Sequence, residues 1–427
     1  MNETLHLPPF VNYDCQLCGW CCHQYDITFS KADHERLSKY DWGKLEPSLA
    51  GKEWCAPLSD SATPDKFHLR YAEDGSCVFL GPDNKCLMHK HVGELGKTMA
   101  CGAYPFTFAG TPTGVYVGMR FSCKAVACGL GEPVVRRTES VRRQLALCRE
   151  AGQVPQYSDT VPFEGGVNLA WSDYLLLEEA LIRIYLRDDL PMARRLFMAH
   201  KLVDILRQAR LDRVRGRKFA ELLGILETGL VHEAESDPLP GPVGGIRNVM
   251  YRQFLFLFQR RQGGSYRELG FFGKLGVRLQ TFWTGVLFAL GAGTAQLPAL
   301  SGPVPLGKIA SIPLPELGPA GELAVSRFLA AKLHGKQHFG KLFFNYSLIQ
   351  GLTFLTLSAG AVMWYARAHA LARGAQKADV PDVLEAIRYV DFCYGYSSAA
   401  ALILERMRVR ILSRDDAAIR LALAQYA

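Results

Sequence analysis

The chain carries cysteines at a spacing that suits metal binding. Two residues separate Cys15 from Cys18 and two more separate Cys18 from Cys21, while Cys22 follows Cys21 directly. Two intervening residues let a tight turn point both sulfurs at one metal ion, about 2.3 Å from each. Adjacent cysteines in an extended chain cannot easily do so, which leaves one of Cys21 and Cys22 for a second metal or another role. The motif predicts a thiolate metal site.

More cysteines follow in the same part of the chain. Ten of the twelve lie between Cys15 and Cys128, a clustering that ordinary buried thiols do not explain. Eight or nine candidate ligands allow either two sites or one site with spare thiols, and the roles of Cys128, Cys148 and Cys393 stay open. The ligands that we expect are Cys15, Cys18, Cys21, Cys22, Cys77, Cys86, Cys101 and Cys123.

Zinc and an iron–sulfur cluster such as [4Fe–4S] both accept four thiolates, so the metal stays open at this point. We favour iron–sulfur, because the number of thiolates exceeds what one structural zinc ion needs. His23, His89 and His91 lie close to cysteines and could instead complete a Cys3His zinc site. The first nine residues lack the pattern of a secretory signal, so we expect a reducing, cytoplasmic location with few disulfides.

Short strands and one short helix should position these cysteines. Cys77–Leu80 and Lys85–His89 predict two strands around the turn at 81–84. A second hairpin is expected from Pro105–Phe108 and Val115–Arg120. Between residues 30 and 37 we expect a helix with Ser30 as its N-cap.

The remaining chain is helical in pattern, which predicts a mainly α protein with a small mixed α+β domain at residues 1–130 and a helical domain at 131–427. Residues 291–321 contain six prolines and predict a long loop. Helix should resume at Glu322 and break near 374–380. The other predicted helices are Val134–Ala151, Asn168–Arg187, Met192–Arg210, Arg217–Glu233, Ile246–Arg261 and Tyr266–Leu290.

Leu342–Ala366 carries no charge and is long enough to span a bilayer, but its polar residues favour a central helix buried in the helical domain. We therefore expect no membrane span. The net charge of +8 is too mild to indicate specific nucleic-acid binding. A basic stretch could hold an anionic partner, although such runs are more often solvated: Arg207, Arg210, Arg213, Arg215, Arg217 and Lys218.

The cysteine motifs resemble the YkgJ-type cysteine-cluster family, which is described as zinc- or iron-chelating and is related to flagellin lysine N-methylases. The resemblance rests on Cys15–Cys22, on Cys77–Leu80 with Cys86–Met88, and on Ala100–Phe106. It implies metal ligands at Cys77, Cys86, Cys101 and Cys123. An Arg-Pro pair commonly precedes the Cys101 position in that family, where this chain has Lys97–Ala100.

Two functions follow from the resemblance. In the first, the chain is similar to the methylases and transfers a methyl group from S-adenosylmethionine to a lysine of a protein substrate, with the cluster holding the methyl donor. In the second, the metal is structural or redox-active in a binding or maturation factor without turnover. Val286–Thr294 mimics a methyltransferase glycine loop, but no helix follows it, so catalytic residues cannot be named.

Overall fold

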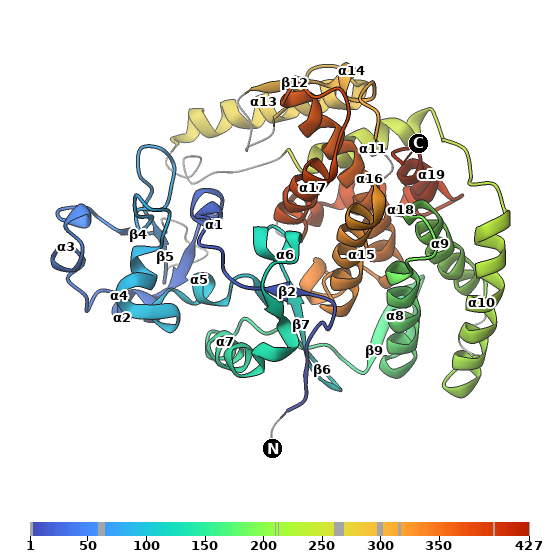
Figure 1. The fold of residues 1–427 in the computed structure, drawn as a ribbon, viewed down its shortest axis with the longest axis horizontal. Coiled ribbons are helices and arrows are strands. Elements are labelled where there is room, and N and C mark those ends of the chain that lie inside the picture. The colour runs from blue at the N-terminus through green and yellow to red at the C-terminus, as the bar shows by residue number, and fades with distance from the viewer. Residues whose placement is uncertain are drawn as a thin grey trace.

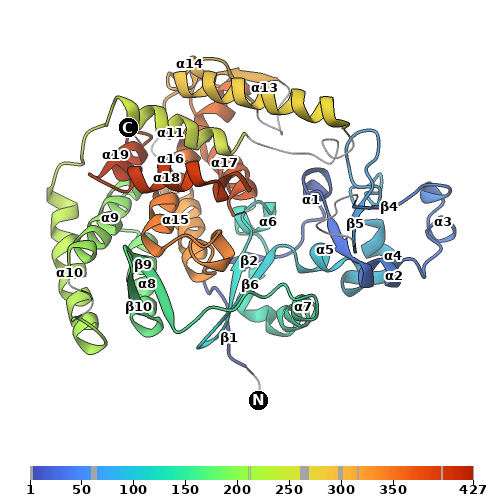
Figure 2. The same cartoon turned by 180° about the vertical axis from the view of Figure 1, so that it is seen from behind.

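The structure, a computed structural model, describes residues 3–58, 65–209, 211, 213–259, 269–296, 302–314, 317–395 and 398–426. It is mainly helical, with small sheets and hairpins in the N-terminal part, as the sequence predicts. Figures 1 and 2 show short elements at one end of the molecule and the long helices at the other.

The described residues between 20 and 98, called the small lobe below, are organised by a three-stranded antiparallel sheet in the order β3-β5-β4. Its elements are α1 (Trp20–Gln24), β3 (Thr28–Ser30), α2 (Lys31–Leu37), α3 (Trp42–Leu45), the 3₁₀ turn η1 (Pro47–Leu49), β4 (Cys55–Pro57), β5 (Lys66–Leu69) and α4 (Leu87–Gly96). Ser30 caps α2 as predicted: its hydroxyl accepts a hydrogen bond from the Asp33 N–H at 3.2 Å. The small lobe has a core of its own that includes Phe29, Trp42 and Phe79.

The predicted hairpin at Pro105–Arg120 is confirmed, and it packs with the helices rather than with the small lobe. Strands β6 (Phe106–Thr111) and β7 (Gly114–Met119) pair antiparallel, and β1 (Leu5–His6) joins β7 in parallel. Around them lie β2 (Asn12–Tyr13), α5 (Met99–Ala103), α6 (Lys124–Cys128) and β8 (Glu132–Pro133). The hairpin's buried residues belong to the same hydrophobic core as the long helices. The domain boundary at residue 130 stays a prediction.

The prediction of a hairpin at Cys77–His89 is correct for the turn and wrong for its two strands. Only Leu80 and Cys86 form a β-bridge, and the chain becomes helix α4 at Leu87. An isolated two-stranded hairpin is marginally stable in water. A helix satisfies its own backbone hydrogen bonds while it buries Leu87 and Met88 in the core of the small lobe.

The helical body begins with the 3₁₀ turn η2 (Val134–Arg137), and its helices match the predictions to within a few residues at most ends. They are α7 (Thr138–Glu150), α8 (Trp171–Leu186), α9 (Met192–Gln208), α10 (Arg217–Ser236), α11 (Ile246–Leu257), α13 (Phe271–Leu290), α14 (Leu306–Ile309), α15 (Gly318–His334), α16 (Leu348–Ala372), α17 (Val380–Cys393), α18 (Ile403–Leu412) and α19 (Ala417–Leu423), with the 3₁₀ turns η3 (Lys341–Phe343) and η4 (Ser398–Ala401). The predicted helix at 168–187 starts later, because an unpredicted hairpin of β9 (Thr160–Glu164) and β10 (Val167–Ala170) precedes it. The predicted helix residues 210, 260, 261 and 266–268 lie outside the described residues.

The proline-rich segment is more ordered than the predicted loop. Strand β11 (Thr294–Gln296) pairs antiparallel with β12 (Pro303–Pro305), α14 follows, and α15 already begins at Gly318. Proline fits β12 because an edge strand leaves some of its N–H groups without ladder partners. Residues 297–301 and 315–316 of the predicted loop lie outside the described part.

Helix α16 is the buried centre of the helical body, as predicted, although it starts at Leu348 instead of Leu342. It is the one helix in the described chain that is long and apolar enough to cross a membrane, and 83% of its most apolar window is buried inside the fold. Its polar side chains are satisfied locally: the hydroxyls of Thr353, Thr356 and Ser358 donate to carbonyls four residues earlier at 2.8–3.0 Å. Ser347 and Gln350 close its N-terminus as a capping box.

Candidate metal centre

The eight predicted ligands gather around α1, which lies between the small lobe and the helical body (Figure 1). Cys21 on α1 is the common neighbour, since its charge acts on Cys15, Cys77, Cys101 and Cys123. Cys18 lies within electrostatic range of Cys15, and Cys86 within range of Cys22, Cys77 and Cys101. Five separate chain segments thus bring their thiols to one region.

The backbone around Gly19 turns the first cysteine segment. Gly19 has a φ of +67°, and a Cβ there would come within 3.3 Å of the Asn84 Oδ1. A left-handed glycine is what a tight turn between Cys18 and α1 requires. The same close approach places the segment on the turn at 81–84, next to Cys86.

Backbone hydrogen bonds fix the thiols on the small-lobe side. The Cys77 N–H donates to the Cys22 carbonyl at 2.8 Å, which ties α1 to the bridge segment. Cys86 pairs with Leu80 and directly precedes α4. Sequence positions 22, 77 and 86 are therefore held together by main-chain contacts, independently of any metal.

The other two thiols come from short helices that pack with the helical body. Cys101 lies on α5, where its N–H donates to the Oγ1 of the fully buried N-cap Thr98 at 3.3 Å. Cys123 is the N-cap residue of α6. Both positions were predicted as ligands, and that role stays a prediction.

The two adjacent thiols on α1 differ in character. A hydrogen bond from Cys22 lowers the pKa of the Cys21 thiol to about 7, while the same bond and burial raise the pKa of Cys22. Without metal, the Cys21 thiol therefore loses its proton more readily than the Cys22 thiol. Ligation of either sulfur replaces this bond with a stronger metal–sulfur bond.

Burial keeps most of the remaining thiols protonated near neutral pH. It raises the pKa of Cys101 and Cys123 to about 12 each, and it raises the pKa of Cys77 as well. In the described part of the chain, no three His, Cys, Asp or Glu side chains are already placed to hold one metal ion. The donor set fits a thiolate-bound metal, but these sulfurs must turn toward a common centre and release protons.

Several residues beside the thiols were missed from the sequence. The Lys97 ammonium lies within electrostatic range of Cys15, Cys21 and Cys101, where it favours their charged forms. A negatively charged thiolate site is stabilised by such a cation. The only sequence feature that could have indicated Lys97 was its position shortly before Cys101, where the family that the motifs resemble commonly has Arg-Pro.

Helix α17 contributes a second missed contact from far along the chain. The Arg388 guanidinium lies 4.8 Å from the Trp20 ring centroid, and Phe392 packs 4.9 Å from the ring of Tyr25. The Tyr25 hydroxyl lies 2.7 Å from the hydroxyl of Ser122, the residue before Cys123. No sequence pattern links residues so distant, yet they join α1 to the helical body.

Cys55, Cys128 and the three histidines have neighbours other than the eight thiols. Cys55 is on β4 near Arg70, and Cys128 lies near Arg388 at the far end of α6. The suggestion that a nearby histidine completes a Cys3His site has no geometric support: His91 pairs with Glu46 at 3.2 Å, and His23 is an exposed neighbour of Asp74. His89 is also exposed.

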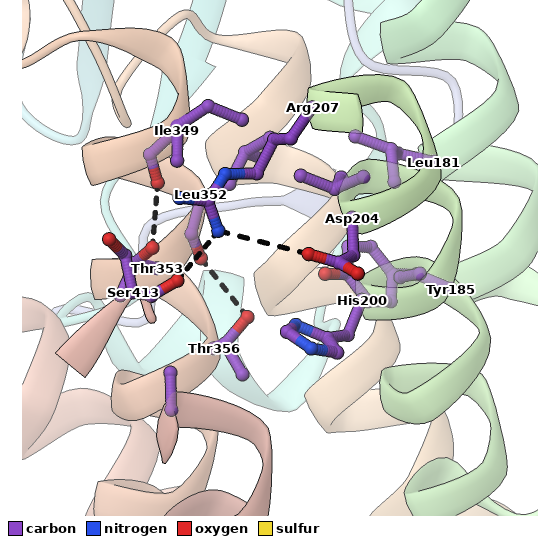
Figure 3. A pocket seen from close by; sticks show the side chains of 13 residues that line it. Leu181, Tyr185, His200, Asp204, Arg207, Ile349, Leu352, Thr353, Thr356 and Ser413 are labelled. Carbon is purple, nitrogen blue, oxygen red and sulfur yellow. Dashed lines mark hydrogen bonds and ion pairs between the residues drawn. The ribbon is translucent and has the colours of Figure 1, made fainter. Parts of the chain in front are cut away.

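Two cavities lie elsewhere, in the helical body. One, of about 30 Å³, is lined mainly by apolar residues of α8, α9 and α16, and Arg207 at its edge pairs with Asp204 (Figure 3). The other is an open groove of about 750 Å³ between the β9–β10 hairpin, the start of α16 and α18, with Arg410 and Arg414 on its wall. Of the basic stretch, Arg207 lines both cavities but is held by Glu164 at 2.8 Å, and Arg210 lies outside the described residues.

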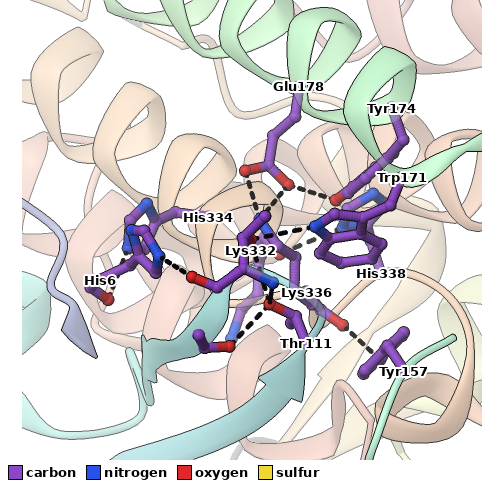
Figure 4. A network of polar contacts seen from close by, with 12 residues as sticks. His6, Thr111, Tyr157, Trp171, Tyr174, Glu178, Lys332, His334, Lys336 and His338 are labelled. Carbon is purple, nitrogen blue, oxygen red and sulfur yellow. Dashed lines mark hydrogen bonds and ion pairs between the residues drawn. The ribbon is translucent and has the colours of Figure 1, made fainter. Parts of the chain in front are cut away.

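The helical body also holds a buried ion pair of Lys336 and Glu178 (Figure 4). Tyr174 donates to the same carboxylate, and the Lys336 ammonium lies 3.5 Å from the Tyr116 ring centroid. Burial lowers the pKa of Lys336 to about 8. With both partners paired in the core, the network joins α8 to the end of α15 as a structural contact.

Comparison with known proteins agrees with the cysteine chemistry. Residues 14–129 match a family model named CxxCxxCC and described as "Putative zinc- or iron-chelating domain". No curated protein and no solved structure matches the chain. The matched range contains all eight gathered thiols and stops before the helical body. Residues 14–129 therefore carry a cysteine-cluster domain of the zinc- or iron-chelating CxxCxxCC type.

Proposed function

We propose that this chain is a metalloprotein that binds iron or zinc in two sites of four thiolates each. The inner site consists of Cys22, Cys77, Cys86 and Cys101, and the outer site of Cys15, Cys18, Cys21 and Cys123. The observation that carries the proposal is the gathering of eight thiols from five segments around α1.

The division follows from the neighbours of the two adjacent cysteines. The Cys22 thiol lies within electrostatic range of Cys77 and Cys86, whereas Cys123 lies within range of Cys21 and Cys15. Cys21 is also within range of Cys77 and Cys101, and we assign it to the outer site by its link to Cys15 and Cys123. The Cys21 and Cys22 thiols are hydrogen-bonded to each other without metal. Because consecutive residues on a helix point about 100° apart, rotation of the two side chains on metal binding would turn the sulfurs toward different centres. This resolves the difficulty that adjacent cysteines pose for a single ion.

Exposure distinguishes the two sites. Cys77 of the inner site is buried, while Cys15 and Cys18 of the outer site are exposed. A structural metal site is closed by protein ligands, and a reactive one keeps an exchangeable position. We therefore assign the inner site to stability and the outer site to exchange with solvent or a small ligand.

Iron–sulfur is the metal that we propose. Both sites offer sulfur alone, and the histidines nearby are exposed or paired, which removes the simplest argument for a Cys3His zinc site. Thiolate-only sites suit iron–sulfur clusters and zinc alike. None of the twelve cysteines forms a disulfide in the structure, which agrees with the cytoplasmic location that we propose.

A second candidate function is methyl transfer to a lysine of a protein substrate, as in the flagellin lysine N-methylases that the motifs resemble. The exposed outer thiols favour it, because S-adenosylmethionine needs an accessible position. The lysine nitrogen would take the methyl group and release a proton, and S-adenosylhomocysteine would leave. The non-enzymatic alternative, a redox or maturation factor, needs no such position.

Serine variants of one cysteine from each site test the two-site proposal, with metal content and thermal unfolding as readouts. Cys18→Ser should lose about half of the bound metal and stay folded, since the outer site is exposed. Cys77→Ser should lose metal and stability together, because inner-site binding contributes folding free energy. Cys55→Ser is the matched control and should keep all its metal. Loss of all bound metal in Cys18→Ser, as expected for one shared site, would overturn the division into two sites.

Titration with S-adenosylmethionine tests the second function. Anaerobic addition should perturb the visible or EPR spectrum of the cluster in the unmodified protein and in Cys55→Ser, but not in Cys18→Ser. Binding without any spectral change would separate the methyl donor from the cluster. Failure to bind would leave the non-enzymatic function, with the metal sites unaffected.

A further inference from the structure

The outward face of α13 is apolar and uncovered. Eight large apolar side chains on this helix are 42–84% exposed: Phe271, Phe272, Leu275, Leu279, Phe282, Trp283, Leu287 and Leu290. They recur every three or four residues and therefore form one stripe along the helix. A helix of a globular protein ordinarily turns such a stripe toward the core.

The opposite face anchors α13 to the helical body. Phe288 is buried, with its ring centroid 5.5 Å from that of Phe256 on α11 and 5.6 Å from that of Trp364 on α16. A Cβ on Gly285 would come within 2.9 Å of the Phe256 ring, so the two helices are in close contact there. In Figures 1 and 2, α13 lies along one edge of the molecule.

The charges on α13 and in the sequence that follows it have one sign. No Asp or Glu occurs from Leu269 to Pro315, whereas Lys274 and Arg278 lie on α13 itself. At 100° per residue, both cations fall on one flank of the apolar stripe. Long basic side chains in such a position can extend to anionic groups while their stems stay on apolar surface.

From this combination we infer that α13 is an interfacial anchor that lies in the surface of an anionic lipid bilayer. The stripe enters the boundary of the acyl chains, and Lys274 and Arg278 contact the head groups. Aromatic residues such as Trp283 favour the membrane–water interface. The two cations beside the stripe complement the charge of anionic head groups, and no Asp or Glu occurs on α13 to oppose them.

This anchoring is distinct from membrane spanning. The helix suited by composition to cross a bilayer, α16, is buried in the helical body. Helix α13, at 20 residues, is about 30 Å long and would lie in the plane of the surface. The inference does not depend on the metal sites.

Vesicle sedimentation of the full, metal-loaded chain tests the anchor. The protein should sediment with phosphatidylcholine vesicles that contain phosphatidylglycerol. Its tryptophan emission, to which six tryptophans contribute, should shift to shorter wavelength, and this shift should be lost when Trp283 is replaced. The double variant Phe282→Glu with Trp283→Glu should lower the partition constant about a hundredfold, since each buried aromatic side chain contributes about tenfold. Lys274→Gln and Arg278→Gln should each lower the preference for anionic vesicles about fivefold.

Exposed apolar residues elsewhere provide the control. Ile225→Glu on α10 and Ile403→Glu on α18 change side chains that are 71% and 73% exposed and should leave sedimentation unchanged. All variants should unfold at the temperature of the unmodified protein, because the altered side chains are at the surface. A chain that sediments with neither type of vesicle overturns the anchor. The anchor is also overturned if the protein is a dimer that the Phe282 and Trp283 substitutions dissociate, because a second copy of the chain would then cover the stripe.

Discussion

Lys332 on α15 and Asp391 on α17 form an ion pair in which both side chains are completely buried. The Asp391 carboxylate also accepts the backbone N–H of Ser122 at 2.8 Å. The Ser122 hydroxyl lies 2.7 Å from that of Tyr25, just after α1. The pair therefore connects the helical body to the segment that carries Cys21 and Cys22.

Removing the carboxylate charge from this pair should destabilise the protein strongly. We expect Asp391→Asn to lower the free energy of unfolding by about 3–5 kcal/mol, because it leaves the Lys332 charge buried and unpaired. Urea unfolding measures the change. The double variant with Lys332→Met should recover part of the loss. In contrast, Arg217→Ala breaks an exposed pair with Glu221 and should cost no more than about 0.5 kcal/mol. Equal losses in Asp391→Asn and Arg217→Ala would show that the buried pair is not a structural link.

The charge of Lys97 should help to retain metal. Lys97→Gln removes a cation beside Cys15, Cys21 and Cys101, and we expect about fivefold weaker retention of metal in competition with a chelator. Lys90→Gln is the matched control, because Lys90 pairs with Glu46 at 2.9 Å and faces solvent. If both variants lose metal alike, general surface charge rather than the position of Lys97 is responsible.

Two buried histidines should make the fold sensitive to acid. Burial lowers the pKa of His334 and His338 to about 3, and the nearby charge of Lys336 adds to both shifts. His338 donates from Nδ1 to the Lys332 carbonyl, and in the described chain its Nε2 has no partner, so a second proton there would find no acceptor. The unfolded state therefore binds more protons between pH 3 and about 6.5.

Stability from these histidines is complete above about pH 6.5 and is lost as the pH falls toward 3. Each histidine should remove about 1.4 kcal/mol of stability per pH unit below about pH 6. Chemical unfolding at several pH values, compared with His334→Gln combined with His338→Gln, measures this contribution. An identical dependence on pH in the variant and the unmodified protein would contradict it.

A glycine on α16 should be irreplaceable. A Cβ on Gly351 would lie 1.7 Å from the His338 carbonyl oxygen, which belongs to the backbone and cannot move aside cheaply. We expect Gly351→Ala to destabilise the protein by about 3 kcal/mol or more, as overpacking does at its upper range. Gly224→Ala on α10 meets no atom within 4 Å and should stabilise by about 0.5–1 kcal/mol. Thermal unfolding of the two variants should shift in opposite directions, and a tolerated Gly351→Ala would refute the close packing.

Local signals predicted much of the fold. Ser30 predicted the start of its helix, because an N-cap acts within one turn. The hairpin at Phe106–Met119 was predicted from its alternating apolar and polar residues and from the turn between its strands. The prediction of a strand at Lys85–His89 was wrong, because Leu87 and Met88 are buried in the core of the small lobe as part of a helix. Non-local packing overrode the local pattern at that point.

The site was predictable in composition but not in arrangement. Spacing indicated Cys15, Cys18, Cys21 and Cys22, and the family resemblance implied Cys77, Cys86, Cys101 and Cys123. The role of these eight thiols as ligands stays a prediction. The proposed assignment of Cys21 and Cys22 to different sites depends on which distant segments pack on each side of α1. Arg388 and Phe392 reach the site from more than 360 residues away in sequence, and no pattern marks them.

The metal content of the purified protein tests the central claim most directly. Elemental analysis and sulfide determination on anaerobically purified protein should find about one metal centre for every four thiolates, as iron with sulfide or, failing that, about two zinc ions per chain. A protein that is folded by circular dichroism and free of both iron and zinc would contradict the account.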